Sequence, residues 1–199
     1  MSIFVPFLTD EEIADEADRF LNENQPEGDI PILIEEIIEF NLGIEIRPVR
    51  GLKVRFGFEG AISHDMTTIL IDEESMLRFP NRYRFTLAHE ISHSILHDEN
   101  IASLSYEVKE DWKKAVLSID PKTYSRMERQ AYALAGCILV PRQQLILSCQ
   151  EANQLAQEHG IDLAEMGESA VSHVAGYFAK NYRVSTAVIE RRIKAEGIF

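Results

Sequence analysis

Basic residues are scarce in this chain, and the deficit bears on the partners that it can bind. Its 20 lysine and arginine residues face 33 aspartate and glutamate residues, which gives a formal net charge of −13 at pH 7. Binding to duplex nucleic acid rests on neutralising phosphates with lysine and arginine. We therefore expect that the chain as a whole does not bind nucleic acid, although a local basic face is compatible with this balance.

Cysteines and long apolar runs are also rare. The two cysteines, Cys137 and Cys149, have no CxxC or Cys-His spacing, which argues against a disulfide scaffold and against a thiolate zinc site. No apolar run reaches the length of a membrane span. The short run Ile3–Leu8 has no basic region before it, and acidic residues follow it at once. We expect neither a signal peptide nor a membrane helix, and hence a cytoplasmic protein.

The chain is long and apolar enough for one sizeable core, with 199 residues of which 45% are hydrophobic. Helical periodicity predicts N-terminal helices within residues 1–43. Thr9-Asp10-Glu11-Glu12 has the pattern of a capping box for the first of them, and the second is expected from about Ile30 to Asn41.

The pattern changes to a period of two between residues 44 and 72, which is typical of half-buried strands. We expect strands at Ile44–Arg47, Lys53–Phe56 and Thr67–Asp72, joined into a small, mainly antiparallel sheet. The sequence therefore predicts an α+β fold, with helices around this sheet.

Two helices within residues 81–141 are expected to be buried. The first runs from Asn81 to about His97, because apolar side chains surround most of its circumference. The second runs from Arg126 to Leu139 and ends before Pro141. Further helices are expected at 142–159, 169–180 and 185–195. We predict one main domain over residues 1–160 and a helical C-terminal unit over residues 161–199.

The first buried helix carries an H-E-x-x-H motif, His89-Glu90-Ile91-Ser92-His93. Residues four apart lie on one face of a helix, so both imidazoles can reach one zinc ion. Glu90 can take a proton from the attacking water, whose pKa the metal lowers. With 6 histidines in the chain, random order produces this motif about 0.02 times per chain. The alternative is a hydrogen-bonded structural pair, but polar side chains in a buried helix need partners, and a metal supplies one.

A catalytic zinc site requires a third protein ligand, and two residues are candidates. His97 lies eight residues beyond His89, about 12 Å along the axis of an unbroken helix. We therefore interpret His97 as a residue that packs near the ligands rather than as a ligand. Glu128 shares an apolar helical stripe with Ala131, Ala135 and Ile138, where a carboxylate is costly without a cation. The spacing alone also permits an exposed Glu128 near the start of its helix.

The sequence resembles the ImmA/IrrE-type metallopeptidases in two separated motifs. One is Arg84-Phe85-Thr86-Leu87-Ala88-His89-Glu90-Ile91-Ser92-His93, ending in His97. The other is Glu128-Arg129-Gln130-Ala131, leading through Ala135 to Leu139-Val140-Pro141. The resemblance covers roughly residues 9–141. The 35 residues from His93 to Glu128 are a longer interval than is usual in that family. The resemblance therefore does not define the shape of the cleft.

The resemblance implies a third ligand and a substrate class. It implies that Glu128 is the third zinc ligand, in a gluzincin-like arrangement. We expect one Zn²⁺ per chain, and another divalent ion such as Mn²⁺ is an alternative. It also implies a helix-turn-helix transcriptional repressor or antitoxin as the protein substrate, whose cleavage relieves repression.

The insertion between the motifs, Asp98 to Ser125, carries Trp112 in a short helix expected around Val108–Leu117. This helix is either a lid over the cleft or an extra cover for the core, and we favour the second. Tyr124 or Tyr132 could donate a hydrogen bond to an oxyanion, but nothing in the sequence selects between them.

The C-terminal unit has the pattern of a helix-turn-helix, with its turn at Tyr182-Arg183-Val184. Its net charge from Glu168 to Phe199 is only +2, which is low for DNA binding. We expect it to pack against the peptidase core.

These observations predict that residues 1–160 form a zincin-like metallopeptidase domain. The predicted enzyme is a zinc-dependent endopeptidase with His89, His93 and Glu128 as metal ligands and Glu90 as general base. The alternative is a zinc-stabilised binding partner that sequesters a repressor without cutting it. The intact H-E-x-x-H motif favours the enzyme, because a scaffold has no need of Glu90.

Overall fold

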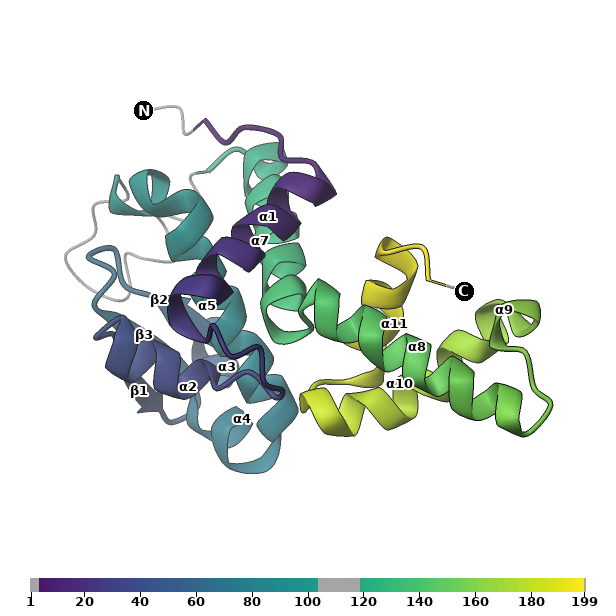
Figure 1. Ribbon diagram of the computed structural model, residues 1–199. Coiled ribbons are helices and arrows are strands. Elements are labelled where there is room, and N and C mark those ends of the chain that lie inside the picture. Colours follow the sequence, from purple (N-terminus) through teal and green to yellow (C-terminus); the bar gives the residue numbers. More distant parts are fainter. Residues whose placement is uncertain (1–3, 104–118, 199) are drawn as a thin grey trace.

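The computed structural model describes residues 4–103 and 119–198 (Figure 1). Helices surround a small three-stranded sheet, which confirms the α+β class. The elements in chain order are α1 (Asp10–Asn24), α2 (Ile34–Glu36), the π-helical turn η1 (Ile37–Asn41), β1 (Glu45–Val49), α3 (Leu52–Phe56), β2 (Gly60–Ile62), β3 (Thr68–Asp72), α4 (Glu73–Arg78), α5 (Pro80–Ala102), α7 (Pro121–Leu139), α8 (Arg142–Glu158), α9 (Leu163–Met166), α10 (Glu168–Tyr182) and α11 (Thr186–Ala195). No helix in the described ranges is both long and apolar enough to cross a bilayer.

The N-terminal helices form largely as the sequence predicts. The Thr9 hydroxyl accepts a hydrogen bond from the Glu12 backbone N–H, and the Glu12 carboxylate accepts one from Thr9, which is the expected capping box. The second helix begins at Ile34 rather than near Ile30. One reason is that Ile30 precedes a proline, and the helical backbone conformation is unfavourable for a residue in that position. Another is that the backbone N–H of Leu33 donates to the Gln25 side chain.

The sheet is mixed rather than mainly antiparallel. Its strand order is β1-β3-β2, with β1 parallel to β3 and β2 antiparallel to β3. The short loop after β2 permits only a hairpin with β3, whereas the longer crossover from β1 to β3 permits a parallel pair. The central strand β3 contributes Ile69 and Ile71 to the core, and both are fully buried.

The segment Lys53–Phe56, which the alternating pattern predicts as a strand, is part of the helix α3. Gly51 and Gly57 bracket this single turn at φ 68° and 88°, in the left-handed region that favours glycine. The Asp72 carboxylate, at the end of β3, accepts a hydrogen bond from the Lys53 backbone N–H at 3.0 Å. A carboxylate at the first turn stabilises a helix, and this tertiary contact overrides the local alternation.

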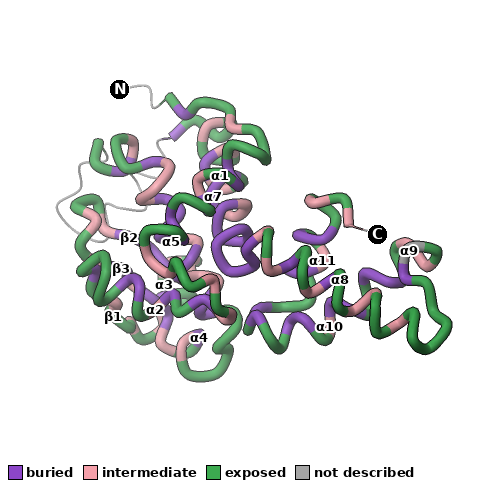
Figure 2. Tube along the Cα trace, in the orientation of Figure 1, coloured by how far each residue is buried: buried purple, intermediate pink, exposed green. Residues whose placement is uncertain are grey.

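Helices α5 and α7 pack against each other at the centre of the molecule, where Figure 2 shows the buried residues concentrated. Helix α5 continues past the expected end at His97, but His97 itself departs from helical geometry, with φ −135° and ψ 20°. Helix α7 begins at Pro121, earlier than the expected Arg126, and the Asp120 side chain caps it. Glu128 therefore lies two turns inside α7, and the alternative that it sits near a helix start is wrong. The predicted helix at Val108–Leu117, with Trp112, lies outside the described residues.

The C-terminal helices α10 and α11 form the expected helix-turn-helix shape, with Arg183 at φ 53° in the turn. This turn packs on the start of α5. The Asn81 amide donates to the Val184 carbonyl at 3.0 Å, and the Arg84 guanidinium donates to the Arg183 carbonyl at 3.3 Å and to the Ile32 carbonyl at 2.7 Å. Arg84 thus joins the N-terminal region to the C-terminal turn. The domain boundary at residue 160 stays a prediction.

Replacing Arg84 with methionine should lower the free energy of unfolding by about 2–4 kcal/mol, because the buried Ile32 carbonyl and the Arg183 carbonyl lose a charged donor. Arg78→Met is the matched control, since Arg78 is exposed and its ion pair is with the exposed Glu74. It should change stability by less than about 0.5 kcal/mol. Urea denaturation measures both, and equal shifts would contradict the bridging role of Arg84.

Candidate metal centre

The H-E-x-x-H helix places its two histidines side by side. His89 and His93 lie one turn apart on α5, and their Nε2 atoms are 3.1 Å from each other. His93 is buried and His89 is mostly buried. This is the arrangement expected of two residues four apart on one helical face.

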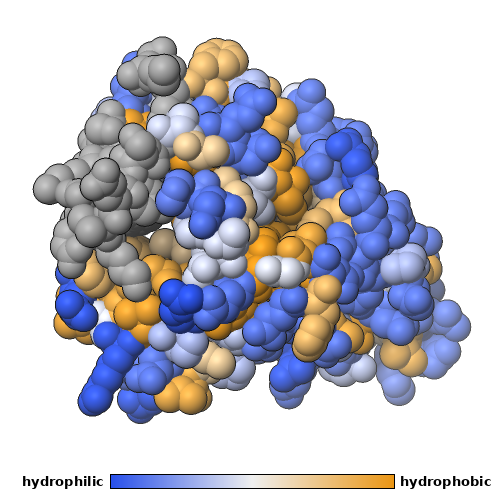
Figure 3. All heavy atoms as spheres, turned by 90° about the vertical axis from the view of Figure 1, so that its left-hand side faces the viewer, coloured by the Kyte–Doolittle hydropathy of each residue, from blue (hydrophilic) through white to orange (hydrophobic). Residues whose placement is uncertain are grey.

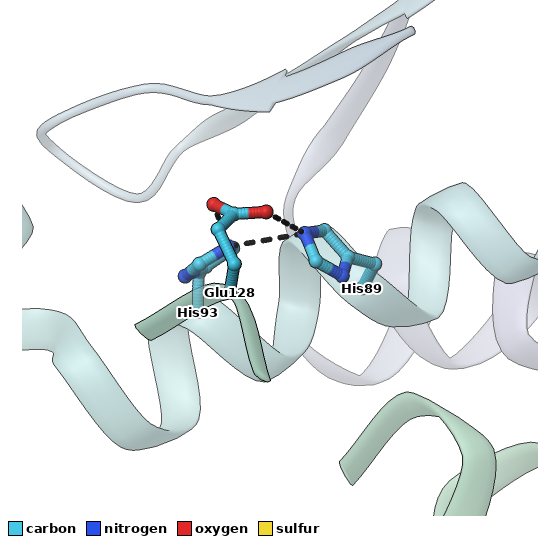
Figure 4. Close-up of side chains that lie close together, drawn as sticks. All are labelled: His89, His93 and Glu128. Atoms are coloured by element: carbon cyan, nitrogen blue, oxygen red, sulfur yellow. Dashed lines mark hydrogen bonds and ion pairs between the residues drawn. The ribbon is translucent and has the colours of Figure 1, made fainter. Parts of the chain in front are cut away.

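Glu128 approaches both rings from the facing helix α7. One of its carboxylate oxygens is 3.4 Å from His89 Nε2, and the other is 3.4 Å from His93 Nε2. Figure 4 shows the carboxylate lying across the two imidazoles. The packing of α5 on α7 therefore brings together all three residues that the sequence singles out as ligands.

The spacing of these donor atoms fits a small divalent metal. Ligands at zinc distances of 2.0–2.1 Å in a tetrahedral arrangement lie about 3.3–3.4 Å apart. The two Nε2 atoms are 3.1 Å apart, and each lies 3.4 Å from a different oxygen of the Glu128 carboxylate. With one ligand atom per residue, the three atoms lie within 4.8 Å of one another, and these residues are the group of metal-ligating side chains found among the described residues. Two imidazole nitrogens and one carboxylate leave a fourth position for water or substrate.

The electrostatics of the trio favour a cation between its members. Burial raises the pKa of Glu128, but the two adjacent imidazoles outweigh this and hold that pKa well below its ordinary value. Burial lowers the pKa of His89, yet its hydrogen bond with Glu128 and the charges of Glu90 and Glu128 raise it overall. Glu128 thus stays an anion in a partly desolvated site, where a bound cation compensates its charge.

Glu90 lies beside the trio with its carboxylate already oriented. One oxygen, Oε2, accepts a hydrogen bond from the backbone N–H of Ile62 on β2 at 3.0 Å. Gly60 on the same strand leaves room for the side chain, since a Cβ there would lie 3.0 Å from Glu90 Oε1. Burial raises the pKa of Glu90 above its ordinary value, which makes its carboxylate a stronger proton acceptor.

A cavity of about 270 Å³ opens over these groups. Its polar wall includes Glu59, Thr86, His89, Glu90, His93, Tyr124 and Glu128. A second cavity of about 490 Å³, between α1, α7 and α11, shares His89 and Glu128 with the first. The trio therefore lies where two cavities meet. On the face that Figure 3 shows, apolar surface gathers in the central hollow, with hydrophilic residues around it.

The structure separates the two candidate tyrosines. Tyr124 lines the first cavity and hydrogen-bonds to Glu128, and burial together with the Glu128 charge raises its pKa to about 12. Tyr132 lines the second cavity instead, packs against Phe85 at 4.8 Å between ring centroids and lies under the Arg191 guanidinium. Tyr124 is the phenol that can donate to a group bound at the trio.

His97 contacts His93 rather than joining the trio. Its Nδ1 is 3.2 Å from His93 Nδ1, and its Nε2 is 2.9 Å from the Gln130 side-chain oxygen. Burial lowers the pKa of His97 to about 4, so the ring is neutral at ordinary pH.

Sequence reasoning assigned no role to Gln130, Gly60 or the Ile62 backbone. Gln130 follows Glu128 by two residues within the second motif, but spacing alone does not show that it reaches the first motif. The contacts of Gly60 and Ile62 depend on how β2 lies against α5, which no local pattern encodes.

An H-E-x-x-H helix that faces a carboxylate on a second helix is the arrangement of a metallopeptidase. A family model of the M78 peptidases, described as the IrrE N-terminal-like domain, matches residues 61–194. The match spans more than half of the chain, and the chain belongs to this family. It confirms the resemblance seen in the two motifs. A comparison with curated proteins found no match.

Gly60→Ala tests how closely β2 approaches α5. The new Cβ would lie 2.5 Å from Thr86 Cγ2 and 3.0 Å from Glu90 Cγ. We expect a loss of about 1–3 kcal/mol in the free energy of unfolding, which is typical of overpacking. The control is Gly176→Ala in α10, which meets no atom within 4 Å and should stabilise the helix by about 0.5–1 kcal/mol. Chemical denaturation that showed Gly60→Ala to be as stable as the control would refute the close approach.

Proposed function

We propose that the protein is a zinc-dependent endopeptidase that hydrolyses a peptide bond in a protein substrate. His89, His93 and Glu128 hold the metal, and Glu90 is the general base. The observation that carries this proposal is that one ligand atom from each of these three residues lies within 4.8 Å of the other two, next to a buried carboxylate, that of Glu90, which is not part of the group.

A divalent metal held by His89, His93 and Glu128 would act as a Lewis acid, which would polarise the scissile carbonyl and lower the pKa of the attacking water. Two neutral imidazoles and one carboxylate suit Zn²⁺, and such a site also accepts Mn²⁺. Glu90 removes the proton from the water. The Ile62 N–H holds Glu90 Oε2, which leaves Oε1 as the proton acceptor, and the same carboxyl then gives the proton to the leaving amine.

Tyr124 stabilises the negative charge that develops on the carbonyl oxygen when water attacks the scissile bond. Its phenol remains protonated because its pKa is raised to about 12, and it lines the cavity next to Glu128. A neutral donor directed at a developing oxyanion stabilises the transition state more than the ground state.

The two cavities that meet at His89 and Glu128 support internal cleavage of a chain. They leave room on both sides of the trio, so that substrate residues before and after the scissile bond can both be bound. An exopeptidase would instead require one side to be closed. The resemblance to ImmA/IrrE-type peptidases supports a helix-turn-helix repressor or antitoxin as the substrate, and the charge of −13 argues against nucleic acid as the partner.

Glu90→Gln and Glu128→Ala separate the base from the ligand. Glu90→Gln preserves the shape of the side chain but removes the proton acceptor, so zinc content should stay near one per chain while cleavage falls by about two to four orders of magnitude. Glu128→Ala removes a ligand, so zinc affinity and cleavage should fall together, and added zinc should raise the melting temperature less than in the wild type.

The assay combines elemental analysis, melting temperature and cleavage of a helix-turn-helix repressor, the substrate class that the resemblance supports. Glu74→Gln, an exposed surface carboxylate on α4, is the matched control and should change none of the three. Cleavage that survives Glu90→Gln unchanged would contradict the mechanism. A wild-type protein that binds the repressor without cutting it would favour the sequestering partner instead.

A further inference from the structure

A row of hydrogen bonds leads from the metal trio to the N-terminal segment of the chain. His93 Nδ1 is 3.2 Å from His97 Nδ1, and His97 Nε2 is 2.9 Å from Gln130 Oε1. Gln130 Nε2 in turn donates to the Pro6 carbonyl at 2.8 Å. The row joins residues from α5, α7 and the N-terminal segment, which are far apart in the sequence.

The last member of the row fixes the direction of every bond before it. The Pro6 carbonyl can only accept, so the Gln130 amide must point its NH₂ group there and its oxygen toward His97. A neutral His97 must then carry its proton on Nε2, which leaves its Nδ1 bare. His93 must therefore donate from Nδ1, and its Nε2 is left without a proton, facing His89 and Glu128.

Burial makes this order difficult to reverse. The exposed fractions of His93, His97 and Gln130 are 8%, 1% and 0%. If the Gln130 amide were flipped, its oxygen would face the Pro6 carbonyl oxygen, and the amide group would face the ring nitrogen that now donates. Water cannot readily replace the lost hydrogen bonds, and an unmade hydrogen bond in a buried site costs about 1–3 kcal/mol.

The Pro6 carbonyl is itself held in place. Arg126 donates to the Val5 carbonyl at 2.6 Å, and Arg129 donates to the Leu8 carbonyl at 3.4 Å. Val5 is buried, with 1% of its surface exposed. Figure 1 shows this N-terminal segment passing beside the start of α7. Three side chains of α7 thus anchor the segment around Pro6.

We propose that His97 and Gln130 are positioning residues that hold His93 as the tautomer with a bare Nε2, the form that binds a metal, and that the Pro6 carbonyl sets their direction. This inference rests on the proposed role of His93 as a ligand. A metal ligand whose second nitrogen donates to a fixed acceptor is pre-organised, and loss of such an acceptor typically weakens metal binding roughly ten- to a hundredfold.

The test compares four variants of the full-length chain. Gln130→Leu removes the acceptor for His97 at similar volume. Gln130→Glu, as the carboxylic acid, retains an acceptor oxygen for His97 and an O–H donor for the Pro6 carbonyl. His97→Phe breaks the row at its other link. Gln144→Leu is the matched control, because the Gln144 amide also donates to a backbone carbonyl, that of Gly28 at 2.9 Å, but lies away from the trio.

Two measurements are made on each variant: the tautomer of His93 in the zinc-free chain, by ¹⁵N NMR of the imidazole nitrogens, and the zinc affinity, by competition with a chelator. In the wild type, Gln130→Glu and Gln144→Leu, we expect the proton of His93 on Nδ1 and similar zinc affinities. In Gln130→Leu and His97→Phe, we expect a mixture of the two neutral tautomers of His93, with the proton on Nδ1 in some molecules and on Nε2 in others. Zinc should bind roughly ten- to a hundredfold more weakly.

The inference is overturned if Gln130→Leu and His97→Phe keep the wild-type tautomer and bind zinc as Gln144→Leu does. A different result would overturn the proposed function: a wild-type chain that binds no zinc. The tautomers of the zinc-free chain would still decide whether the row of hydrogen bonds orients His93. If Gln130→Leu fails to fold, His97→Phe decides by the same two measurements.

Discussion

The packing of α5 against α7 is the constraint on which the metal centre depends. His89 and His93 come from one helix and Glu128 from the other, so a small shift between the helices would separate the donors. Alanines at the contact, Ala88, Ala131 and Ala135, are fully buried. Small side chains let two helices approach closely, and close approach is what brings a short glutamate side chain within 3.4 Å of both rings.

Charged groups at this contact oppose the stability of the core and serve the chemistry. Glu90 is buried and Glu128 is partly buried, so both carboxylates have lost some contact with water. The negative charge of each needs a particular partner. The Ile62 N–H compensates Glu90, and the His89 imidazole lies 3.4 Å from Glu128, whose charge a bound cation would also compensate. A buried carboxylate contributes to the fold only as long as such partners are present. The sheet therefore has a direct role in the site, because β2 supplies both the N–H group and, at Gly60, the space for Glu90.

The sequence predicts those features that depend on local spacing. That His89 and His93 lie together follows from helical periodicity. The apolar stripe through Ala131 and Ala135 made Glu128 a candidate ligand, but it also permitted an exposed Glu128 near the start of its helix. The strand expected at Lys53–Phe56 was wrong because Asp72, from another element, caps a helix there. The row from His93 to Pro6 could not be predicted, since its direction is set by three segments that meet only in the folded chain.

The central claim is that His89, His93 and Glu128 together bind one metal ion. Crystals of the zinc-loaded protein, measured on both sides of the zinc absorption edge, test it most directly. The account predicts one anomalous peak per chain, about 2.0–2.2 Å from Nε2 of His89, Nε2 of His93 and a carboxylate oxygen of Glu128. A peak ligated by His97 in place of Glu128, or no peak between α5 and α7, would contradict it.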